Sequence, residues 1–117
     1  MNAVLSRLKD IGCNVEQGLE VCCGNEDRYL KSLNRFAESR YLDEQEKAYR
    51  SKNIERCKAF AREMSAEYFN LGLDALYYLN AALLELSGAK QFEELGEVLS
   101  CLRERYNQYV NIIRSAV

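Results

Sequence analysis

The chain contains no histidine and no proline, and only 6 of its 117 residues are glycine. Without histidine, the side chain that most often transfers protons near neutral pH and most often binds metals is missing. Because proline is absent and glycine is scarce, the composition favours helices joined by short connections. A chain of this length can bury one hydrophobic core, so we expect a single all-α domain over residues 1–117.

The chain also lacks a marked excess of one charge and any long apolar run. Its 16 basic and 18 acidic residues are spread along the sequence and give a net charge of −2. This balance predicts no binding to nucleic acid or to an anionic membrane surface. The charged residues Arg7, Lys9 and Asp10 interrupt the apolar N-terminus, and no apolar run approaches the ~20 residues of a membrane span. We therefore expect a cytoplasmic protein.

The 5 cysteines form an odd set without a C-x-x-C pair, and no histidine is present to complete a common zinc site. They are Cys13, Cys22, Cys23, Cys57 and Cys101. We interpret them as reduced, mostly buried thiols that pack as small hydrophobic residues, with Cys22 and Cys23 partly exposed before a turn. No metal ion and no other cofactor is expected.

Amphipathic segments occupy almost the whole chain. We expect short helices over residues 2–11 and from Asn14 to Cys22 or Cys23, followed by long helices over residues 25–51, 53–72, 73–86 and 92–113. Asn14, Asn25 and Asn53 are the expected N-caps. Residues 41–49 are rich in charged side chains, so we expect this part of its helix to project beyond the core. Long segments with short connections predict an antiparallel up-down-up-down four-helix bundle, topped by the two short N-terminal helices.

Apolar residues at steps of three and four mark the inner faces of the long segments. In the helix over residues 53–72 they are Ile54, Cys57, Ala61, Met64, Tyr68 and Leu71. In the next helix they are Leu73, Leu76, Leu83 and Leu86, together with either Leu79 or Asn80. In the last helix they are Phe92, Leu95, Leu99, Leu102, Tyr106, Tyr109 and Ile113. We expect Leu33, Met64, Leu76, Leu83, Leu99 and Leu102 to share one core.

Residues 53–72 read NIERCKAFAREMSAEYFNLG, in which Arg62 stands among small residues on the face opposite the core. This segment resembles the central helix of the histidine-containing phosphotransfer (HPt) domain, D-x(8)-H-x-L-K-G-x(5)-G, which usually has Leu before the final Gly. Asn53 stands at the Asp, Arg62 at the His, Met64 at the Leu, Ser65 at the Lys, Ala66 at the first Gly and Leu71–Gly72 at the closing Leu-Gly. The spacing of the family pattern is kept, while its reactive residues are replaced.

A second block of the resemblance lies in the N-terminal half of the chain. It comprises VEQGLE over residues 15–20, CGNED over residues 23–27 and YLKSLNRF over residues 29–36. HPt domains commonly show a Gly-Leu pair, a Gly-Gly-Asp turn and a Tyr-Leu-x-x-Leu-x-x-Phe helix start at these distances. The resemblance extends along the whole chain and implies the HPt fold.

In the HPt family the histidine accepts a phosphoryl group from an aspartate of a response-regulator receiver domain. A guanidinium stays protonated and has no lone pair for attack on phosphorus, so Arg62 cannot replace that histidine. The resemblance therefore implies a pseudo-HPt protein with no catalytic residue, no phosphorylation site and no enzymatic activity. It implies a docking surface for a receiver domain or a hybrid histidine kinase, made of Ala59, Arg62, Ser65, Ala66 and Phe69. We expect a monomer that acts as a competitor or scaffold in a phosphorelay.

A second hypothesis stays open, in which the chain is a helical adaptor or structural module with an unrelated partner. Such a module could pair with itself through Tyr77, Tyr78 or the tyrosines of the last helix. In this interpretation Phe69 packs under the neighbouring helix and Arg62 is an ordinary surface charge.

Overall fold

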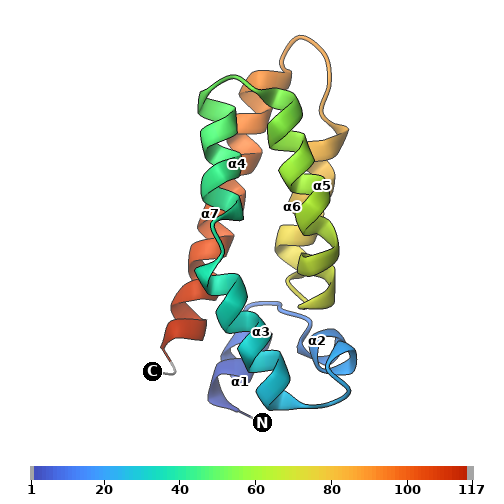
Figure 1. The fold of residues 1–117 in the computed structure, drawn as a ribbon, viewed down its shortest axis with the longest axis vertical. Helices are drawn as coiled ribbons and strands as arrows, with labels where there is room; N and C mark the ends of the chain where they lie inside the picture. Colours follow the sequence, from blue (N-terminus) through green and yellow to red (C-terminus); the bar gives the residue numbers. More distant parts are fainter. Residues whose placement is uncertain (1, 116–117) are drawn as a thin grey trace.

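The computed structural model describes residues 2–115, which form seven α-helices and no β-strand (Figure 1). In chain order these are α1 (Ala3–Asp10), α2 (Val15–Val21), α3 (Glu26–Glu38), α4 (Tyr41–Arg50), α5 (Ile54–Asn70), α6 (Asp74–Glu85) and α7 (Gln91–Arg114). The all-α class expected from the composition is confirmed. No helix in this part of the chain is both long enough and apolar enough to cross a membrane.

The helices form an elongated body that measures 47 × 24 × 20 Å. Helices α4, α5, α6 and α7 lie along its long axis, while α1, α2 and α3 lie at the end that carries the N-terminus (Figure 1). Helix α5 contacts α4 and α6, and α7 contacts α6 and α4. Helix α3 packs against α7 and α2, and α1 packs against α7 and α2.

The three predicted helix starts at Asn14, Asn25 and Asn53 are confirmed. In each case the side-chain oxygen of the asparagine accepts a hydrogen bond from the backbone N–H three residues further on, at 3.0 to 3.1 Å. Such a bond satisfies one of the N–H groups that have no partner within the helix. The short polar side chain before each apolar segment therefore fixes where the helix begins.

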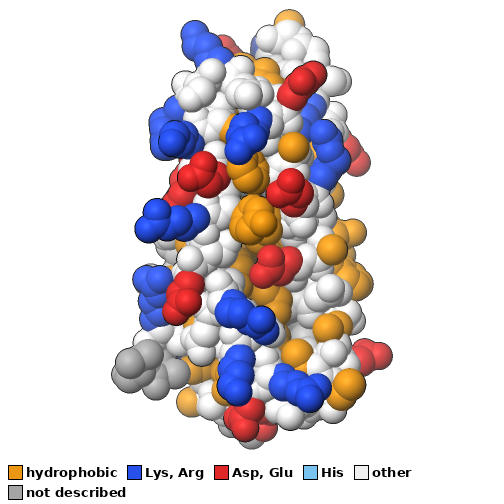
Figure 2. Space-filling model, in the orientation of Figure 1, with side chains coloured by type: hydrophobic (Ala, Val, Ile, Leu, Met, Phe, Trp, Pro, Cys, Tyr) orange, Lys and Arg blue, Asp and Glu red, His pale blue; other side chains and the backbone are white. Residues whose placement is uncertain are grey.

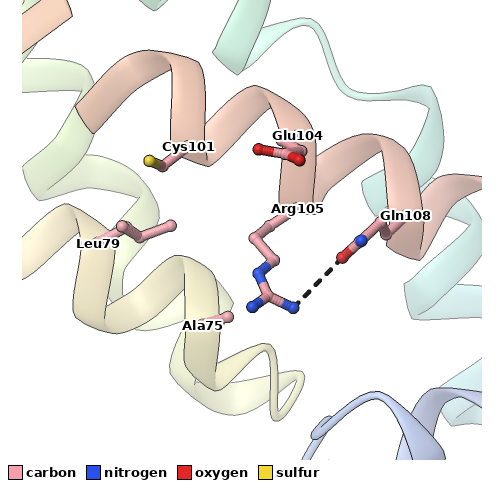
Figure 3. Close-up of a pocket in the computed structure, with 6 residues that line it drawn as sticks. All are labelled: Ala75, Leu79, Cys101, Glu104, Arg105 and Gln108. Atoms are coloured by element: carbon pink, nitrogen blue, oxygen red, sulfur yellow. Dashed lines mark hydrogen bonds between the residues drawn. The ribbon is translucent and has the colours of Figure 1, made fainter. Parts of the chain in front are cut away.

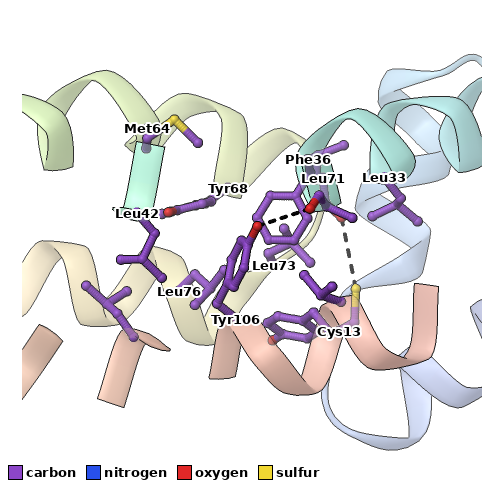
Figure 4. Close-up of a cluster of buried hydrophobic side chains, with 14 of the residues drawn as sticks. Cys13, Leu33, Phe36, Leu42, Met64, Tyr68, Leu71, Leu73, Leu76 and Tyr106 are labelled. Carbon is purple, nitrogen blue, oxygen red and sulfur yellow. Dashed lines mark hydrogen bonds between the residues drawn. The ribbon is translucent and has the colours of Figure 1, made fainter. Parts of the chain in front are cut away.

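The inner faces predicted for the long helices are largely confirmed. The six leucine and methionine residues expected to share one core are at most 4% exposed and belong to one cluster of buried side chains. Figure 4 shows three of them, Leu33, Met64 and Leu76. On α5, Ile54 is half-buried and the other predicted residues are buried. On α6, Asn80 rather than Leu79 takes the inner position, and its Nδ2 donates a hydrogen bond to the carbonyl oxygen of Ala61 at 3.0 Å.

The single long helix predicted over residues 25–51 is wrong. Ser39 adopts an extended conformation (φ −65°, ψ 142°) and separates α3 from α4. The prediction that residues 41–49 project beyond the core is wrong as well, because one side of α4 is buried against the neighbouring helices. The buried residues of α4 are Leu42, Gln45 and Ala48.

The break between α3 and α4 changes which side of the chain faces the core. If α3 continued past Ala37 without interruption, its next inner positions would include Arg40 and Glu44, which are charged. The interruption at Ser39 shifts the phase so that the apolar positions of α4 turn inward. At the break, backbone carbonyl groups accept hydrogen bonds from α7 in place of helical ones. The Tyr106 hydroxyl donates to the carbonyl oxygens of Ala37 (3.2 Å) and Ser39 (3.3 Å).

Phe92 was predicted to begin the inner stripe of α7, but its side chain is 36% exposed and the stripe begins at Leu95. The Phe92 ring stacks on the ring of Tyr49 in α4, with centroids 4.5 Å apart. The Tyr49 hydroxyl also donates to the Phe92 carbonyl oxygen at 2.9 Å. A Cβ atom at Gly96 would lie 2.4 Å from the Tyr49 hydroxyl, so this surface contact depends on the glycine.

The connection between α1 and α2, the start of α3 and the turn between α5 and α6 meet at one place. We call it the Gly72 junction and define it by Asn14, Gly18, Tyr29, Leu71 and Gly72. The Asn14 N–H donates to the Gly72 carbonyl oxygen at 2.8 Å, and the Tyr29 hydroxyl donates to the Leu71 carbonyl oxygen at 2.6 Å. Parts of the chain that are far apart in sequence are therefore held together by these two hydrogen bonds.

The two glycines of the Gly72 junction leave no room for a side chain. A Cβ atom at Gly18 would lie 2.2 Å from the ring of Tyr29, and one at Gly72 would lie 2.0 Å from the carbonyl oxygen of Asn14. Gly72 also has a φ of +73°, a conformation that glycine adopts more easily than other residues. The two sequence blocks that carry the family resemblance therefore meet in space at this junction.

Candidate functional site

The five residues predicted for docking lie on α5, and we call them the Arg62 face. Arg62 and Ala66 are exposed, Ala59 and Ser65 are half-buried, and the Phe69 side chain is 47% exposed. Ala59, Arg62, Ala66 and Phe69 recur at steps of three and four, on the side of α5 that faces away from the core. They form a continuous row in which the arginine has small residues one turn away on either side.

The hydroxyl group of Ser65 is already engaged. It donates to the carbonyl oxygen of Ala61 at 2.8 Å, and this oxygen also accepts the hydrogen bond from Asn80 of α6. Within residues 2–115 no carboxylate or other base is hydrogen-bonded to the Ser65 hydroxyl, so nothing there activates it as a nucleophile. Ser65 therefore contributes to the edge of the Arg62 face without offering reactive chemistry.

Phe69 does not pack beneath the neighbouring helix. Its ring lies beside Tyr77 of α6, with centroids 5.5 Å apart and planes tilted by 56°. Tyr77 in turn meets Tyr78 edge to face at 5.4 Å, and the Tyr78 side chain is 67% exposed. The apolar end of the Arg62 face thus continues across α6 as a row of three aromatic rings.

Like other exposed cations such as Arg50, Arg62 has no side-chain hydrogen-bond partner among the described residues. It forms no ion pair there, whereas Arg103 of α7 pairs with Asp43 and Glu46 of α4. Lys58, one turn before Arg62 on α5, donates from Nζ to the carbonyl oxygen of Leu86 at 2.6 Å. The guanidinium of Arg62 is consequently available to an external carboxylate or phosphate, which arginine can bind by two parallel hydrogen bonds.

A hollow of about 480 Å³ adjoins the Arg62 face. Its lining residues are Val21 and Cys22 of α2, Ser32 and Arg35 of α3, and Glu63, Ala66, Glu67, Asn70 and Leu71 of α5. Burial raises the pKa of the Glu67 carboxyl group above its usual value, and the positive charge of Arg35 opposes that rise. A partner that covers Ala66 would therefore also reach α2 and α3, where the exposed Val21 provides further apolar surface.

The expectation that the cysteines are mostly buried is wrong. Cys13 and Cys57 are buried, and burial raises the pKa of each thiol to about 11. Cys22 is half-buried, while Cys23 and Cys101 are exposed. All five are free thiols, and in the described part of the chain no three Cys, Asp or Glu side chains are grouped so that they could hold a metal ion.

Sequence patterns did not predict the hollow of about 390 Å³ between α6 and α7 (Figure 3). It is lined by Ala75 and Leu79 of α6 and by Cys101, Glu104, Arg105 and Gln108 of α7. The inner stripes of the two helices gave no information about their outer sides. The sequence does contain one indication of an unusual outer side, because α6 carries no charged residue from Ala75 to Leu84.

A narrow column of hydrophobic side chains runs along the groove between α4 and α5, flanked by charged side chains of both signs (Figure 2). Tyr41 and Phe60 line a hollow of about 350 Å³ in this region. Their rings meet edge to face at 6.0 Å, and the Arg56 guanidinium lies 4.9 Å from the Phe60 centroid. Arginine and glutamate side chains line this hollow in equal number, so its charges do not favour a ligand of either sign.

Taken together, the residues of the Arg62 face offer groups that can bind a partner. Arg62 supplies hydrogen-bond donors and a fixed positive charge, and its neighbours supply a low apolar surface. Comparison of the chain with protein-family models, with curated proteins and with solved structures finds no match.

Proposed function

We propose that this protein is a pseudo-HPt domain of two-component signalling that binds response-regulator receiver domains without accepting phosphate. In this proposal α3 with α4, then α5, α6 and α7 form the antiparallel up-down-up-down four-helix bundle of the HPt fold, and α1 and α2 cover one end. The contacts of α4 with α5, α5 with α6, α6 with α7 and α7 with α4 support this arrangement. The meeting of the two motif blocks at the Gly72 junction supports it as well.

The observation that carries the proposal is the exposed row formed by Ala59, Arg62, Ala66 and Phe69. The arginine stands where HPt domains carry the phosphorylated histidine, and small side chains beside it let a flat partner approach closely. In the family, a receiver domain presents its acidic pocket to this position. A fixed positive charge there attracts carboxylates, and the apolar residues supply the remainder of an interface.

The same residues support the absence of phosphotransfer. Arg62 has no lone pair, Ser65 is bonded to the backbone, and the chain has no histidine to accept phosphate instead. Bound to a receiver domain, the protein would occupy the surface that an active phosphotransfer domain needs. Competition or scaffolding within a phosphorelay follows, in a protein that binds neither nucleic acid nor membrane and that acts in the cytoplasm.

The direct test is calorimetric titration of the protein with a panel of receiver domains, or hybrid kinases that contain them, from the same organism. Arg62→Ala and Phe69→Ala should each weaken binding to the cognate receiver, and Arg62→Lys should recover it only in part, because lysine lacks the planar two-point contact. Arg50→Ala on α4 is the matched control, since Arg50 is also an exposed helical arginine. Equal affinities for all variants would remove the Arg62 face from the interface.

The effect of Mg²⁺ adds a second readout to the titration. Mg²⁺ in the receiver pocket neutralises its carboxylates, so binding through Arg62 should be tightest without the metal and weaker when it is present. The Arg62→Ala variant should lose most of this metal dependence. A metal dependence that is the same in wild type and variant would show that Arg62 does not face the pocket.

Chemical inertness is tested by incubation with a phosphorylated receiver domain. We expect no acid-labile phosphate on the wild type, and Arg62→His alone should not restore full transfer, because Ser65 and Ala66 still replace the family's Lys and Gly. Stable phosphate on any side chain of the wild type would contradict the pseudo-HPt assignment.

One observation favours a second candidate function, that of a helical adaptor with an unrelated protein partner. The aromatic row Phe69, Tyr77 and Tyr78 extends the apolar surface from α5 onto α6, well beyond the position of Arg62. An adaptor that uses this row should lose its partner with Tyr78→Ala and keep it with Arg62→Ala. A receiver-binding protein should show the opposite order of effects.

A further inference from the structure

The hollow between α6 and α7 (Figure 3) is bordered by an uncharged helix face on one side and a charged helix face on the other. On α6, Ala75 and Leu79 are half-buried and Ala82 is exposed. On α7, the exposed residues that share this side of the helix at steps of three and four are Glu97, Cys101, Glu104, Arg105 and Gln108. We call these residues the α6–α7 face.

Two charges of opposite sign on α7 are equally spaced about Cys101. Glu97 lies four residues before Cys101, and Arg105 lies four residues after it. With a rise of 1.5 Å per residue, each charge is about 6 Å from Cys101 along the helix axis. Neither residue takes part in an ion pair within residues 2–115, and Arg105 donates there to the Gln108 side chain at 3.3 Å.

A two-fold axis through Cys101 would bring these opposite charges together. In an antiparallel pair of α7 helices, the residue four positions before the axis faces the residue four positions after it in the other copy, so each Glu97 meets an Arg105. A parallel pair would instead place Glu97 beside Glu97 and Arg105 beside Arg105, and like charges repel. The pattern is therefore self-complementary in one orientation only.

Helix α6 supplies apolar surface to the same contact. The small side chains of Ala75 and Ala82 allow a second helix to come within the usual interaxial distance of about 8–10 Å. Leu79 and the hollow beside it can take up side chains of the other copy. Because α6 has no charge between Ala75 and Leu84, covering this side desolvates no ionised group of that helix.

We propose that two copies of this chain associate through the α6–α7 face, about a two-fold axis near Cys101, with two Glu97–Arg105 ion pairs across the interface. This dimer takes the place of the monomer expected from the sequence. It leaves Arg62 on α5 uncovered and does not depend on receiver binding. The dimer would carry the Arg62 face twice, which would give bivalent binding to a partner that is itself dimeric.

The test is sedimentation velocity over a concentration series of the full chain. The wild type should dimerise, and Glu97→Arg and Arg105→Glu should each raise the dissociation constant at least about tenfold, because each places like charges opposite one another. The double variant Glu97→Arg/Arg105→Glu should return close to the wild-type value, since the pair is restored with its signs exchanged. Arg50→Glu on α4 is the matched control and should leave the dimer unchanged, and thermal melts of all variants check that they fold.

Cross-linking locates the axis. Oxidation with diamide should join the two Cys101 thiols, which lose two electrons and two protons to diamide as the Sγ–Sγ bond forms. Cys101→Ser should abolish the cross-linked dimer, and Cys23→Ser, which removes an exposed thiol on another part of the chain, should not. A cross-link that depends on Cys23 instead of Cys101 would overturn the proposed axis.

Two sedimentation results would overturn the interface itself. One is a wild type that stays monomeric at the highest attainable concentration, which would leave the α6–α7 face to a different protein or to solvent. The other is a dimer that neither single charge reversal weakens, which would place the contact elsewhere. Receiver titrations of the single variant Glu97→Arg separate this proposal from the previous one, because loss of the dimer leaves each Arg62 face intact.

Discussion

The Gly72 junction and the Arg62 face both involve α5, but they differ in how strictly the structure fixes their residues. At the junction, Tyr29 is fully buried, its hydroxyl is bonded to the Leu71 carbonyl, and a Cβ atom at Gly72 would collide with the backbone of Asn14. On the Arg62 face, Arg62 and Ala66 point to solvent and touch little of the protein itself. The junction tolerates almost no change, whereas the Arg62 face can change without loss of the fold.

Under the proposed pseudo-HPt function, this difference would explain how the chain keeps the spacing of the HPt motif while the reactive residues of that motif are replaced. Gly18, Tyr29 and Gly72 hold the N-terminal helices to the turn between α5 and α6, so any substitution there costs folding free energy. The position of Arg62 contributes nothing comparable to folding. Selection for the fold alone would preserve the junction, and only selection for a partner would preserve the exposed row.

Gly72→Ala is the substitution expected to have the largest effect. It forces an alanine into a φ of +73° and drives its Cβ into the carbonyl oxygen of Asn14. An alanine is strained in this left-handed backbone conformation, and the collision also breaks the Asn14–Gly72 hydrogen bond. Together these effects should lower the free energy of unfolding by about 3 kcal/mol. Urea unfolding monitored by circular dichroism measures this change.

Gly88→Ala separates strain from collision in that experiment. Gly88 has a φ of +91°, but a Cβ atom there meets nothing within 4 Å. In this control the free energy of unfolding should fall only by the cost of the left-handed conformation, about 1–2 kcal/mol. Equal losses at the two glycines would mean that the contact with Asn14 contributes nothing, and the junction would be no stricter than an ordinary turn.

Tyr29→Phe keeps the ring and removes the hydroxyl, which donates to the Leu71 carbonyl oxygen and lies 3.6 Å from the Cys13 Sγ atom. The Leu71 carbonyl oxygen would lose its 2.6 Å bond in a buried place, which should cost about 1–3 kcal/mol of stability. Tyr41→Phe, in an exposed ring on α4, is the matched control and should change stability by less than about 0.5 kcal/mol. Similar melting temperatures for the two variants would argue against a structural role for the Tyr29 hydroxyl.

The buried thiol of Cys13 lies 3.6 Å from the Tyr29 hydroxyl of the junction and should make the stability of the protein sensitive to alkaline pH. Burial raises the pKa of this thiol from 9.0 to about 11. As the pH rises above 9, the unfolded chain releases a proton that the folded chain keeps, so the free energy of unfolding falls. We expect the stability lost between pH 8 and pH 10 to be about 1 kcal/mol smaller in Cys13→Ala than in wild type.

The measurement is urea unfolding at the two pH values. Cys101→Ser serves as the control, because it removes an exposed thiol on α7 in place of a buried one. An identical pH dependence in wild type and Cys13→Ala would show that the Cys13 thiol is ionised as easily in the folded protein as in the unfolded chain.

Sequence patterns predicted most of the fold, because the helix starts and inner faces depend on local chemistry. An asparagine before an apolar segment and apolar residues at steps of three and four act within one helix, and both were placed correctly for α5. The break at Ser39 was missed because apolar residues on either side suggested continuity. The helical spacing of the apolar residues does indicate the break, since an unbroken helix would turn the charged side chains of Arg40 and Glu44 toward the core.

The candidate site was predictable only in part. Exposure of the Arg62 row follows from helical periodicity, but the engagement of the Ser65 hydroxyl and the contact of Phe69 with Tyr77 depend on how α6 is placed. Such contacts join residues whose separation in sequence says nothing about their distance in space. The hollow between α6 and α7 was missed for the same reason.

Arg62→Ala is the substitution with the smallest expected effect on folding, and it tests whether the Arg62 face tolerates change better than the Gly72 junction. Arg62 is exposed and forms no ion pair within the described residues, and alanine is the better helix former, so stability should change by less than about 0.5 kcal/mol. Arg103→Ala is the control, because Arg103 forms ion pairs with Asp43 and Glu46 of α4. Its loss should lower the free energy of unfolding by up to about 1 kcal/mol. Thermal and urea unfolding of both variants measure the difference. If Arg62→Ala lost as much stability as Arg103→Ala, Arg62 would have a structural role, and any weakened receiver binding of that variant would no longer indicate a direct contact.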